Sequence, residues 1–399
     1  MPMIRRYSNE EFLTVLLDTN SGGRLVPELP AELSNSQWAV DSNGDGFASF
    51  ELIPETIVFT TSGSTGKPKN VRKSRDQIAR EAEAVLGVVS HGTSRPDEVI
   101  SFAPPNHAFG FLCGFALSLR LGVPFTYNPI NAGIPPAGVG INSSLVLALP
   151  ASFRALEKSE DAFTSRSRTA ILQSAGPASP RYAATIEALR TKSVEGFEIY
   201  GSTEAGAIAH RRTDVAPNAW TLFNDIELLP SGDVSGVTSE MIVSGPRCAF
   251  ESQEGNVDIL RSNQSLSVRT GDIARFTGQR QFALVGRLDR VIQINGVNTD
   301  LDVLQQQLTH YFQDVDFYVE KKTDDLRGHG FVVHFFCGGT GGHVERIKQE
   351  VAYIVSEAYP KSIYPSKIEL SREPFRRSPS GKVLGLPRSQ FSGARIDVL

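Results

Sequence analysis

A segment rich in glycine and hydroxyl residues carries the strongest chemical signal in the sequence, and it reads Thr61-Ser-Gly-Ser-Thr-Gly-Lys-Pro-Lys69. Glycines allow backbone N–H groups to approach a polyphosphate closely, while hydroxyl side chains add donors and lysines add positive charge. The segment is not a Walker A loop, because Pro68 stands where that motif needs Ser or Thr. We therefore predict a phosphate-binding loop, although an ordinary turn can have the same composition.

Strands and helices alternate around this loop. Residues 56–60 are typical of a strand that runs into the loop, and after Ser74, a good helix cap, apolar residues recur at helical spacing up to Val89. Further buried strands are expected at 99–102, 145–149, 170–173 and 197–200, with helical segments such as 180–192 between them. This alternation predicts an α/β fold with a mostly parallel sheet, whose ligands bind at the carboxyl ends of the strands.

The pattern changes in the second half of the chain. Between about 205 and 288, short apolar runs separated by turn signals predict an antiparallel, barrel-like subdomain. The remainder predicts a small α+β domain, in the order helix 300–311, strand 316–319, strand 331–336, helix 344–359 and strand 367–370. We expect a large domain over 1–288 and a small one over 289–399.

Composition excludes several classes of protein. The chain has 40 Lys plus Arg and 44 Asp plus Glu among 399 residues, a net charge of −4 without blocks of like charge, so neither nucleic acid nor an anionic membrane surface is expected as a partner. Cys113, Cys248 and Cys337 are too far apart in sequence for a redox pair or a closely spaced thiolate metal site. We expect a cytoplasmic protein without a membrane span.

Four more segments extend the chemistry of the loop. They are Tyr200-Gly-Ser-Thr-Glu204, Thr270-Gly-Asp272, Gly286-Arg-Leu-Asp-Arg-Val-Ile292 and Ser378-Pro-Ser-Gly-Lys382. With the loop they resemble, in the same order, the TSGSTGxPK, YGxTE, TGD, GRxDxxI and TxxGK signatures of the adenylate-forming superfamily, which includes acyl-CoA synthetases, aryl-CoA ligases, firefly luciferase and peptide-synthetase adenylation domains. The resemblance implies ATP-dependent formation of an acyl-AMP, followed by acyl transfer to the thiol of CoA or of a carrier protein's phosphopantetheine.

The resemblance also implies a role for each residue. Because two anions meet when a carboxylate attacks the α-phosphate, cations and donors are needed where charge develops. Thr203 would contact the α-phosphate, Glu204 would hold Mg²⁺, and Lys382 would bridge the acyl carboxylate and the nucleotide. Asp272 suits the ribose hydroxyls, with Arg287 nearby. The implied nucleotide-binding set is Thr61, Ser62, Gly63, Ser64, Thr65, Gly66, Lys69, Tyr200, Gly201, Ser202, Asp272 and Arg287.

Two segments resemble the walls of the family's acid pocket. Asn106-His-Ala-Phe-Gly110 resembles HxxG, with His107 as a gate beside the carboxylate and Gly110 in the pocket. Ala108 stands where amino-acid activators have Asp, so an aryl or fatty-type acid is favoured over an α-amino acid. Ser174-Ala-Gly-Pro-Ala178 resembles the SGGAP wall, which implies Ser174 and Gly176. Gly110, Gly114 and Ala116 either leave room for substrate or serve close helix packing.

The chain departs from the family pattern in length and in its thiol segment. Only about sixty residues precede the loop, as in a compact, N-terminally shortened subgroup, in which the acceptor is either CoA or a carrier protein. Gln293 and Val303 stand where many relatives have Lys and Glu. Asp289 matches the family's hinge position, about which the small C-terminal domain would move as a lid.

Three competing interpretations remain open. Asp41-Ser-Asn-Gly-Asp-Gly46 imitates the start of an EF-hand loop, but Leu52 occupies the position of the bidentate ligand, which favours a polar turn. Ser64-Thr-Gly-Lys67 spells the SxxK of serine acyl hydrolases, but Pro68 breaks the helix that such a motif needs. A non-catalytic homologue that keeps the nucleotide pocket for sensing or scaffolding is the stronger rival.

Overall fold

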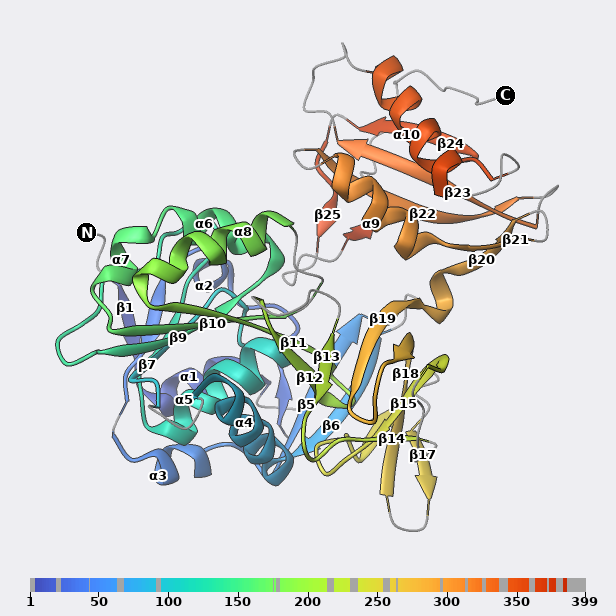
Figure 1. Ribbon diagram of the computed structural model, residues 1–399. Coiled ribbons are helices and arrows are strands. Elements are labelled where there is room, and N and C mark those ends of the chain that lie inside the picture. Colours follow the sequence, from blue (N-terminus) through green and yellow to red (C-terminus); the bar gives the residue numbers. More distant parts are fainter. Residues whose placement is uncertain are drawn as a thin grey trace.

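A large N-terminal part and a smaller C-terminal part make up the computed structural model (Figure 1). It describes residues 4–18, 23–42, 44–62, 68–90, 95–174, 176, 180–213, 219–229, 236–253, 259–262, 265–294, 297–312, 315–324, 328–336, 344–358, 363–371, 373–377 and 383–385. The predicted α/β class is confirmed, because parallel strands and helices form the large part.

Five parallel strands form the centre of the large sheet, in the order β8-β7-β9-β10-β11. They are β7 (Glu98–Ser101), β8 (Phe125–Tyr127), β9 (Ser143–Ala148), β10 (Arg168–Gln173) and β11 (Val194–Ser202). Strands covered on both faces are apolar throughout, which explains why the four predicted runs were recognisable and are confirmed.

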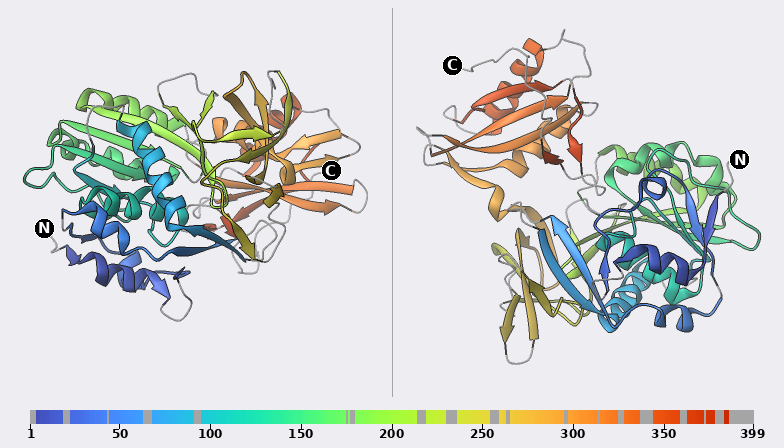
Figure 2. Two further views of the ribbon diagram at one scale, coloured as in Figure 1. Left: turned by 90° about the horizontal axis from the view of Figure 1, so that it is seen from below. Right: turned by 180° about the vertical axis from the view of Figure 1, so that it is seen from behind.

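Different helices cover the two faces of this sheet (Figure 2). Alternate strand residues point to opposite faces: Val99 and Leu145 pack in one hydrophobic cluster, Ile100 and Val146 in the other. The first cluster includes residues of α4 (Arg75–Ser90), the π-helix η1 (Gly110–Phe115) and α5 (Ala116–Leu121). The second includes residues of α6 (Phe153–Glu157), α7 (Glu160–Thr164) and α8 (Pro180–Leu189). Short 3-10 helices η2 (Pro150–Ser152) and η3 (Arg190–Lys192) accompany α6 and α8.

The first fifty residues extend one edge of the sheet. β1 (Arg5–Tyr7) pairs with β4 (Trp38–Val40), and β4 pairs with β8. The helices of this stretch are α1 (Asn9–Leu16), α2 (Ala31–Ser34) and α3 (Gly46–Glu51). Asp45 caps α3, since its Oδ1 accepts from Ala48 N at 3.0 Å, and this geometry favours the polar turn over a calcium loop.

A hairpin carries the predicted phosphate loop, and the sequence analysis did not predict its second strand. β5 (Thr56–Ser62) pairs antiparallel with β6 (Pro68–Ser74), so a strand separates the loop from α4. The pattern was obscured because Lys73, 1% exposed, occupies an inward position on β6 together with Val71. This second sheet has the order β16-β6-β5-β3-β2, with β2 (Leu17–Asp18), β3 (Arg24–Leu25) and β16 (Glu251–Gln253). The predicted Ser74 cap of α4 is confirmed, because its Oγ accepts from Gln77 N at 3.2 Å.

Antiparallel strands follow β11, as predicted, and they continue the large sheet. β11 pairs with β12 (Gly206–Arg212), and the path runs on through β13 (Trp220–Leu222), β19 (Gln281–Arg287), β18 (Ser265–Phe276), β15 (Thr238–Ser244) and β14 (Glu227–Leu229), with β17 (Ile259–Ser262) beside β18. The segments of the predicted TGD and YGxTE motifs therefore lie in one sheet.

The C-terminal part has its own sheet and core (Figure 1). After η4 (Leu288–Arg290), its elements are β20 (Val291–Ile294), β21 (Val297–Asp300), α9 (Leu301–Tyr311), β22 (Asp316–Asp324), β23 (Gly328–Phe336), α10 (Val344–Ala358), β24 (Lys367–Ser371), β25 (Arg376–Arg377) and β26 (Val383–Gly385). The separate core, from Ile292 to Ile368, is compatible with the boundary at 288/289, which stays a prediction. No helix of the described chain is long and apolar enough to span a bilayer.

Candidate active site

The carboxyl ends of β7, β9, β10 and β11 meet at one edge of the sheet, because these strands are adjacent and parallel. His107 follows β7, Ser174 follows β10, and Tyr200 lies near the end of β11. Ligands of α/β sheets bind at this edge. The fold thus brings together motifs that are up to about a hundred residues apart.

A hydrogen-bonded triad of Tyr200, Asp272 and Arg287 is the best-defined feature of the edge. Tyr200 donates its hydroxyl to Asp272 Oδ2, and Arg287 Nη1 donates to Oδ1 at 2.8 Å. Asp272 and Arg287 are paired directly across β18 and β19. Burial, and then the Asp272 carboxylate, raise the pKa of Tyr200 well above its usual value, so its hydroxyl stays protonated and donates. Three of the sequence-predicted nucleotide residues therefore form one cluster.

The turn after β11 carries Thr203 and Glu204, both half-buried. Ser202 Oγ accepts from Ala205 N at 3.1 Å, and the Glu204 carbonyl accepts from Ala249 N at 2.7 Å. Gly201, the second-last residue of β11, is exposed. The predicted metal ligand thus stands on a turn whose backbone is held from two sides.

Sequence reasoning missed the charged side chains behind this turn. Lys73, Glu81 and Arg247 are all buried, and Lys73 Nζ lies 3.4 Å from the Glu204 carbonyl oxygen. Glu81 lies on the buried face of α4, where a charge breaks the apolar spacing. A glutamate on the apolar face of a predicted helix was the one sequence signal that could have indicated these buried charges.

His107 is half-buried at the same edge and has a buried, unsatisfied ring nitrogen. Burial lowers the pKa of His107, which favours the neutral imidazole. Its Nε2 has no hydrogen-bond partner within the described residues, although it is buried. Buried polar atoms are normally paired, so a ligand group with a carboxylate would fit here. Ala108 follows at the start of the helical turn.

The glycines after His107 are explained by packing. A Cβ at Gly110 would lie 2.2 Å from the Pro104 oxygen and 2.6 Å from the Ala103 oxygen. A Cβ at Gly114 would meet Phe125 at 3.1 Å. The geometry therefore favours close packing over open substrate space at both positions. They lie in a π-helix, an element frequent at functional sites.

The predicted SGGAP-like wall follows β10, and its first residue is hydrogen-bonded to β11. Ser174 Oγ donates to the Ile199 carbonyl at 3.0 Å, and Gln173 Nε2 donates to the Gly176 carbonyl at 2.7 Å. Gly176 itself is exposed. Both predicted residues thus lie at the carboxyl edge, next to the strand that carries Tyr200.

The remaining predicted residues belong to the phosphate loop and to the C-terminal part. Gly63, Ser64, Thr65, Gly66 and Lys382 lie outside the described residues. The backbones of Thr61 and Ser62 end β5, where Thr61 pairs with Lys69. Asp289 lies in η4, Gln293 in β20 and Val303 in α9.

The described residues could bind Mg²⁺ only if phosphate oxygens of the nucleotide supplied further ligands. None of them forms a group of three or more His, Cys, Asp or Glu side chains able to hold a metal ion. Mg²⁺ is commonly held by one or two carboxylates plus substrate phosphates. Glu204 as a single protein ligand agrees with that mode.

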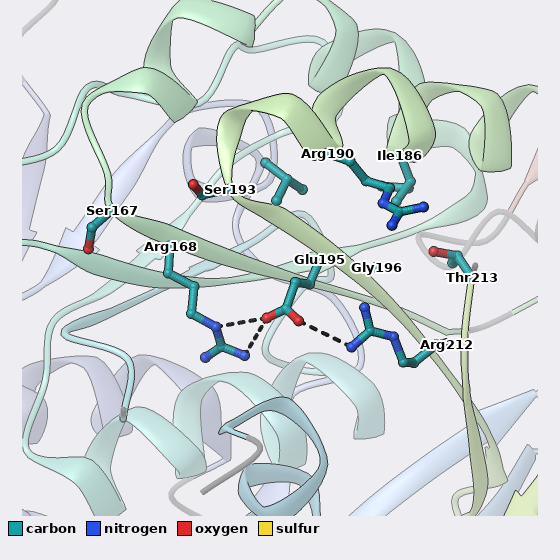
Figure 3. A pocket seen from close by; sticks show the side chains of 10 residues that line it. Ser167, Arg168, Ile186, Arg190, Ser193, Glu195, Gly196, Arg212 and Thr213 are labelled. Atoms are coloured by element: carbon teal, nitrogen blue, oxygen red, sulfur yellow. Dashed lines mark hydrogen bonds and ion pairs between the residues drawn. The ribbon is translucent and has the colours of Figure 1, made fainter. Parts of the chain in front are cut away.

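Two cavities in the described part of the chain lie elsewhere. One, of about 400 Å³, lies at the amino ends of β10 and β11, where Glu195 binds Arg168 and Arg212 (Figure 3). The other, of about 680 Å³, lies between α4 and β12. We assign the site to the carboxyl edge nevertheless, because the half-buried triad and the unsatisfied His107 lie there.

Comparison with known proteins identifies related families. Residues 51–230 match the family described as AMP-binding enzyme. The phosphate loop and the YGxTE-like segment lie within this match, which confirms the resemblance to AMP-binding enzymes of the adenylate-forming superfamily.

Named relatives point to the same class. The chain is 30% identical to a 4-coumarate–CoA ligase of Halorhodospira halophila over 250 residues, which are 61% of this chain and 53% of the relative. It is 28% identical to a 4-coumarate–CoA ligase of Rhodobacter capsulatus, covering 61% of this chain and 55% of the relative. The chain thus spans about half the length of these curated relatives.

A solved structure shares the fold. The o-succinylbenzoate CoA synthetase of Bacillus subtilis, in complex with its acyl-adenylate intermediate, superposes with a TM-score of 0.63 at 18% identity. The similarity covers 86% of this chain and 70% of that one.

Proposed function

We propose that this protein activates a carboxylic acid with ATP and transfers the acyl group to the thiol of CoA or of a carrier-protein phosphopantetheine. The observation that carries the proposal is the Tyr200–Asp272–Arg287 triad, a half-buried carboxylate with a fixed orientation at the ligand edge of an AMP-binding domain. Asp272 is suited to accept from ribose hydroxyls.

The chemistry proceeds in two balanced steps. A substrate carboxylate oxygen attacks the α-phosphorus of ATP, and pyrophosphate leaves with the electron pair of the broken P–O bond. A thiol sulfur then attacks the acyl carbon, the thiol gives up its proton, and AMP leaves. Mg²⁺, held by Glu204, would neutralise phosphate charge, while Lys69, Thr203 and Lys382 would bind the nucleotide and the acid.

We propose an aryl or fatty-type acid as the substrate. Ala108 offers no carboxylate to an α-ammonium group, and the unsatisfied His107 Nε2 is available to an acid. Because the curated relatives are 4-coumarate–CoA ligases, 4-coumarate heads the test panel.

Exchange of labelled pyrophosphate into ATP tests the proposal. Purified protein with Mg²⁺ is assayed with 4-coumarate, benzoate, medium-chain fatty acids and the proteinogenic amino acids. We expect exchange with aryl or fatty acids, and strong exchange with an amino acid would refute the pocket interpretation. Product analysis with CoA and with a phosphopantetheinylated carrier protein then identifies the acceptor.

The rival proposal is a nucleotide-binding protein without catalysis, favoured by Gln293 and Val303 in the thiol segment. It predicts saturable ATP binding with no exchange for any acid. Calorimetric ATP titration alongside the exchange assay distinguishes the two proposals.

A further inference from the structure

Three buried charged side chains and the half-buried Asp225 form a cluster behind the turn that carries Glu204. They are Lys73 of β6, Glu81 of α4, and Asp225 and Arg247 of two loops in the β-rich segment. Lys73, Glu81 and Arg247 are 1%, 2% and 0% exposed. Isolated charges are rarely buried to this degree, so the cluster needs an explanation.

Arg247 is the centre of the cluster. Its Nη1 donates to Glu81 Oε2 at 2.9 Å, and its Nε and Nη2 form a fork with Asp225 at 2.7 and 2.8 Å. Lys73 Nζ donates to the Arg247 carbonyl oxygen. Burial opposes the charge of Arg247, but Glu81 and Asp225 outweigh it and raise the pKa of Arg247 further. Two positive and two negative groups balance one another.

The cluster also binds the backbone of the turn directly. Glu81 Oε1 accepts from Ala207 N at 2.7 Å, and Lys73 Nζ lies 3.4 Å from the Glu204 oxygen. Gly206 has a positive φ of 77°, and a Cβ there would lie 2.2 Å from Glu81 Oε2. Both sides of the Glu204 turn are therefore tied to one cluster of charges.

Stability alone explains this arrangement poorly. Replacing a buried ion pair with apolar side chains is often neutral or stabilising, because desolvation offsets the attraction. A comparable buried pair elsewhere, Arg166 with Glu98 of β7 at 2.7 Å, has no hydrogen bond to the Glu204 turn. It provides a matched control.

We propose that Lys73, Glu81 and Arg247 are positioning residues that orient the Glu204 turn for acid activation. The inference rests on the proposed function and extends it to residues outside its motifs. Their role is to fix the backbone from which Glu204 reaches the metal and the phosphates.

The test compares two charge-balanced double variants, Lys73→Met/Glu81→Gln and Glu98→Gln/Arg166→Met. Pyrophosphate exchange is measured as a function of Mg²⁺ and of acid, and the Tm of each variant is recorded. Groups that orient a metal ligand typically contribute 10- to 100-fold, so we expect a loss of about that size in the rate and in apparent Mg²⁺ affinity for the first variant. The KM for the acid should change by less than about twofold. The control pair should keep the wild-type Mg²⁺ dependence at a similar loss of Tm.

Three outcomes decide the matter. Wild-type Mg²⁺ dependence in Lys73→Met/Glu81→Gln, or an equal loss in the control pair, would overturn the inference while leaving the proposed function intact. Absence of exchange in the wild-type protein with every acid refutes the proposed function, and the inference falls with it. If the double variant does not fold, Glu81→Gln alone decides: it keeps an acceptor for Ala207 N, and an unchanged Mg²⁺ dependence would contradict the proposal.

Discussion

At the scale of single residues, the candidate site depends on how a few polar atoms are satisfied. Both oxygens of Asp272 have donors, and His107 Nε2 has none within the described residues. The first observation indicates that Asp272 is an acceptor with a fixed orientation. The second indicates that His107 Nε2 is available for a hydrogen bond to a ligand. Both residues were predicted from motifs, and so was Arg287 beside Asp272, but the hydrogen bond from Tyr200 to Asp272 was not.

Asp272→Asn tests the acceptor. The amide keeps the size of the side chain but removes its charge and places a donor opposite Tyr200 or Arg287. A hydrogen bond to a charged group contributes about 1.5–3 kcal/mol, so ATP affinity should fall by roughly 10- to 100-fold. Calorimetric titration of ATP measures this change. The control is Glu240→Gln, which alters the ion pair between Glu240 of β15 and Arg269, a residue on the same strand as Asp272. This control should bind ATP as the wild type does. Equal ATP affinities in all three proteins would contradict the ribose assignment.

At the scale of elements, close packing determines where the His107 loop lies. Gly110 packs against the Ala103 and Pro104 carbonyls with no space for a Cβ, whereas Gly87, exposed on α4, has nothing within 4 Å of a Cβ. The two glycines of helical segments thus have opposite surroundings. The same substitution, glycine to alanine, should therefore change stability in opposite directions at the two positions.

Gly110→Ala should destabilise the protein, because backbone atoms must move, and overpacking of this kind costs about 1–3 kcal/mol. Gly87→Ala should stabilise it by about 0.5–1 kcal/mol through helix propensity. Thermal unfolding of both variants measures the difference. A Gly110→Ala protein as stable as the wild type would show that the His107 loop can shift freely.

The small sheet contains a pH-dependent contact. Glu320 on β22 lies 3.0 Å from His334 Nε2 on β23, and this hydrogen bond is the first cause that lowers the pKa of Glu320 below its ordinary 4.5. A lowered folded-state pKa stabilises the fold above the ordinary pKa, and the contribution is lost as pH falls through the folded value. The Tm of Glu320→Gln should therefore fall less than that of the wild type between about pH 6 and pH 3. Parallel slopes, as expected for the exposed-site control Glu227→Gln, would refute this.

At the scale of the whole molecule, one carboxylate spans the predicted hinge. Asp302 of α9 accepts from Arg287 N at 3.2 Å and from Arg290 Nε at 2.7 Å. These two arginines flank Leu288 and Asp289, the link between the large sheet and the small one (Figure 1). Movement of the small part would have to change these contacts.

Asp289→Pro should separate the two half-reactions. Proline restricts φ at 289 and the conformation of Leu288, and hinges act through a few such dihedrals. We expect acyl-AMP formation to persist and most thioester formation to be lost. Pyrophosphate exchange measures the first, and acyl transfer from supplied acyl-AMP the second. Asp289→Ala, which leaves φ free, should keep both; equal loss of both in the proline variant would exclude a hinge at this position.

Local chemistry made much of this protein predictable. The parallel strands contain short apolar runs, and helix α4 has apolar spacing and a Ser74 cap. The motifs of the site depend on glycines and small polar residues that stand together in the chain. Such patterns depend on neighbours within a few residues, so the sequence carries them directly. The α/β class, the order of elements and the superfamily were accessible for that reason.

Long-range partnerships were not accessible. The burial of Lys73 on β6 was not predicted, because its partner Arg247 lies 174 residues away. Burial of a charge is tolerable only when an opposite charge or a carbonyl meets it, and no local pattern records which distant residue does so. For the same reason, the sequence left open whether Gly110 leaves room for substrate or serves close packing. The position of the Pro104 carbonyl in the folded chain decides this in favour of packing. The folded chain decides which charges are buried and paired, since only folding brings their partners within hydrogen-bonding distance.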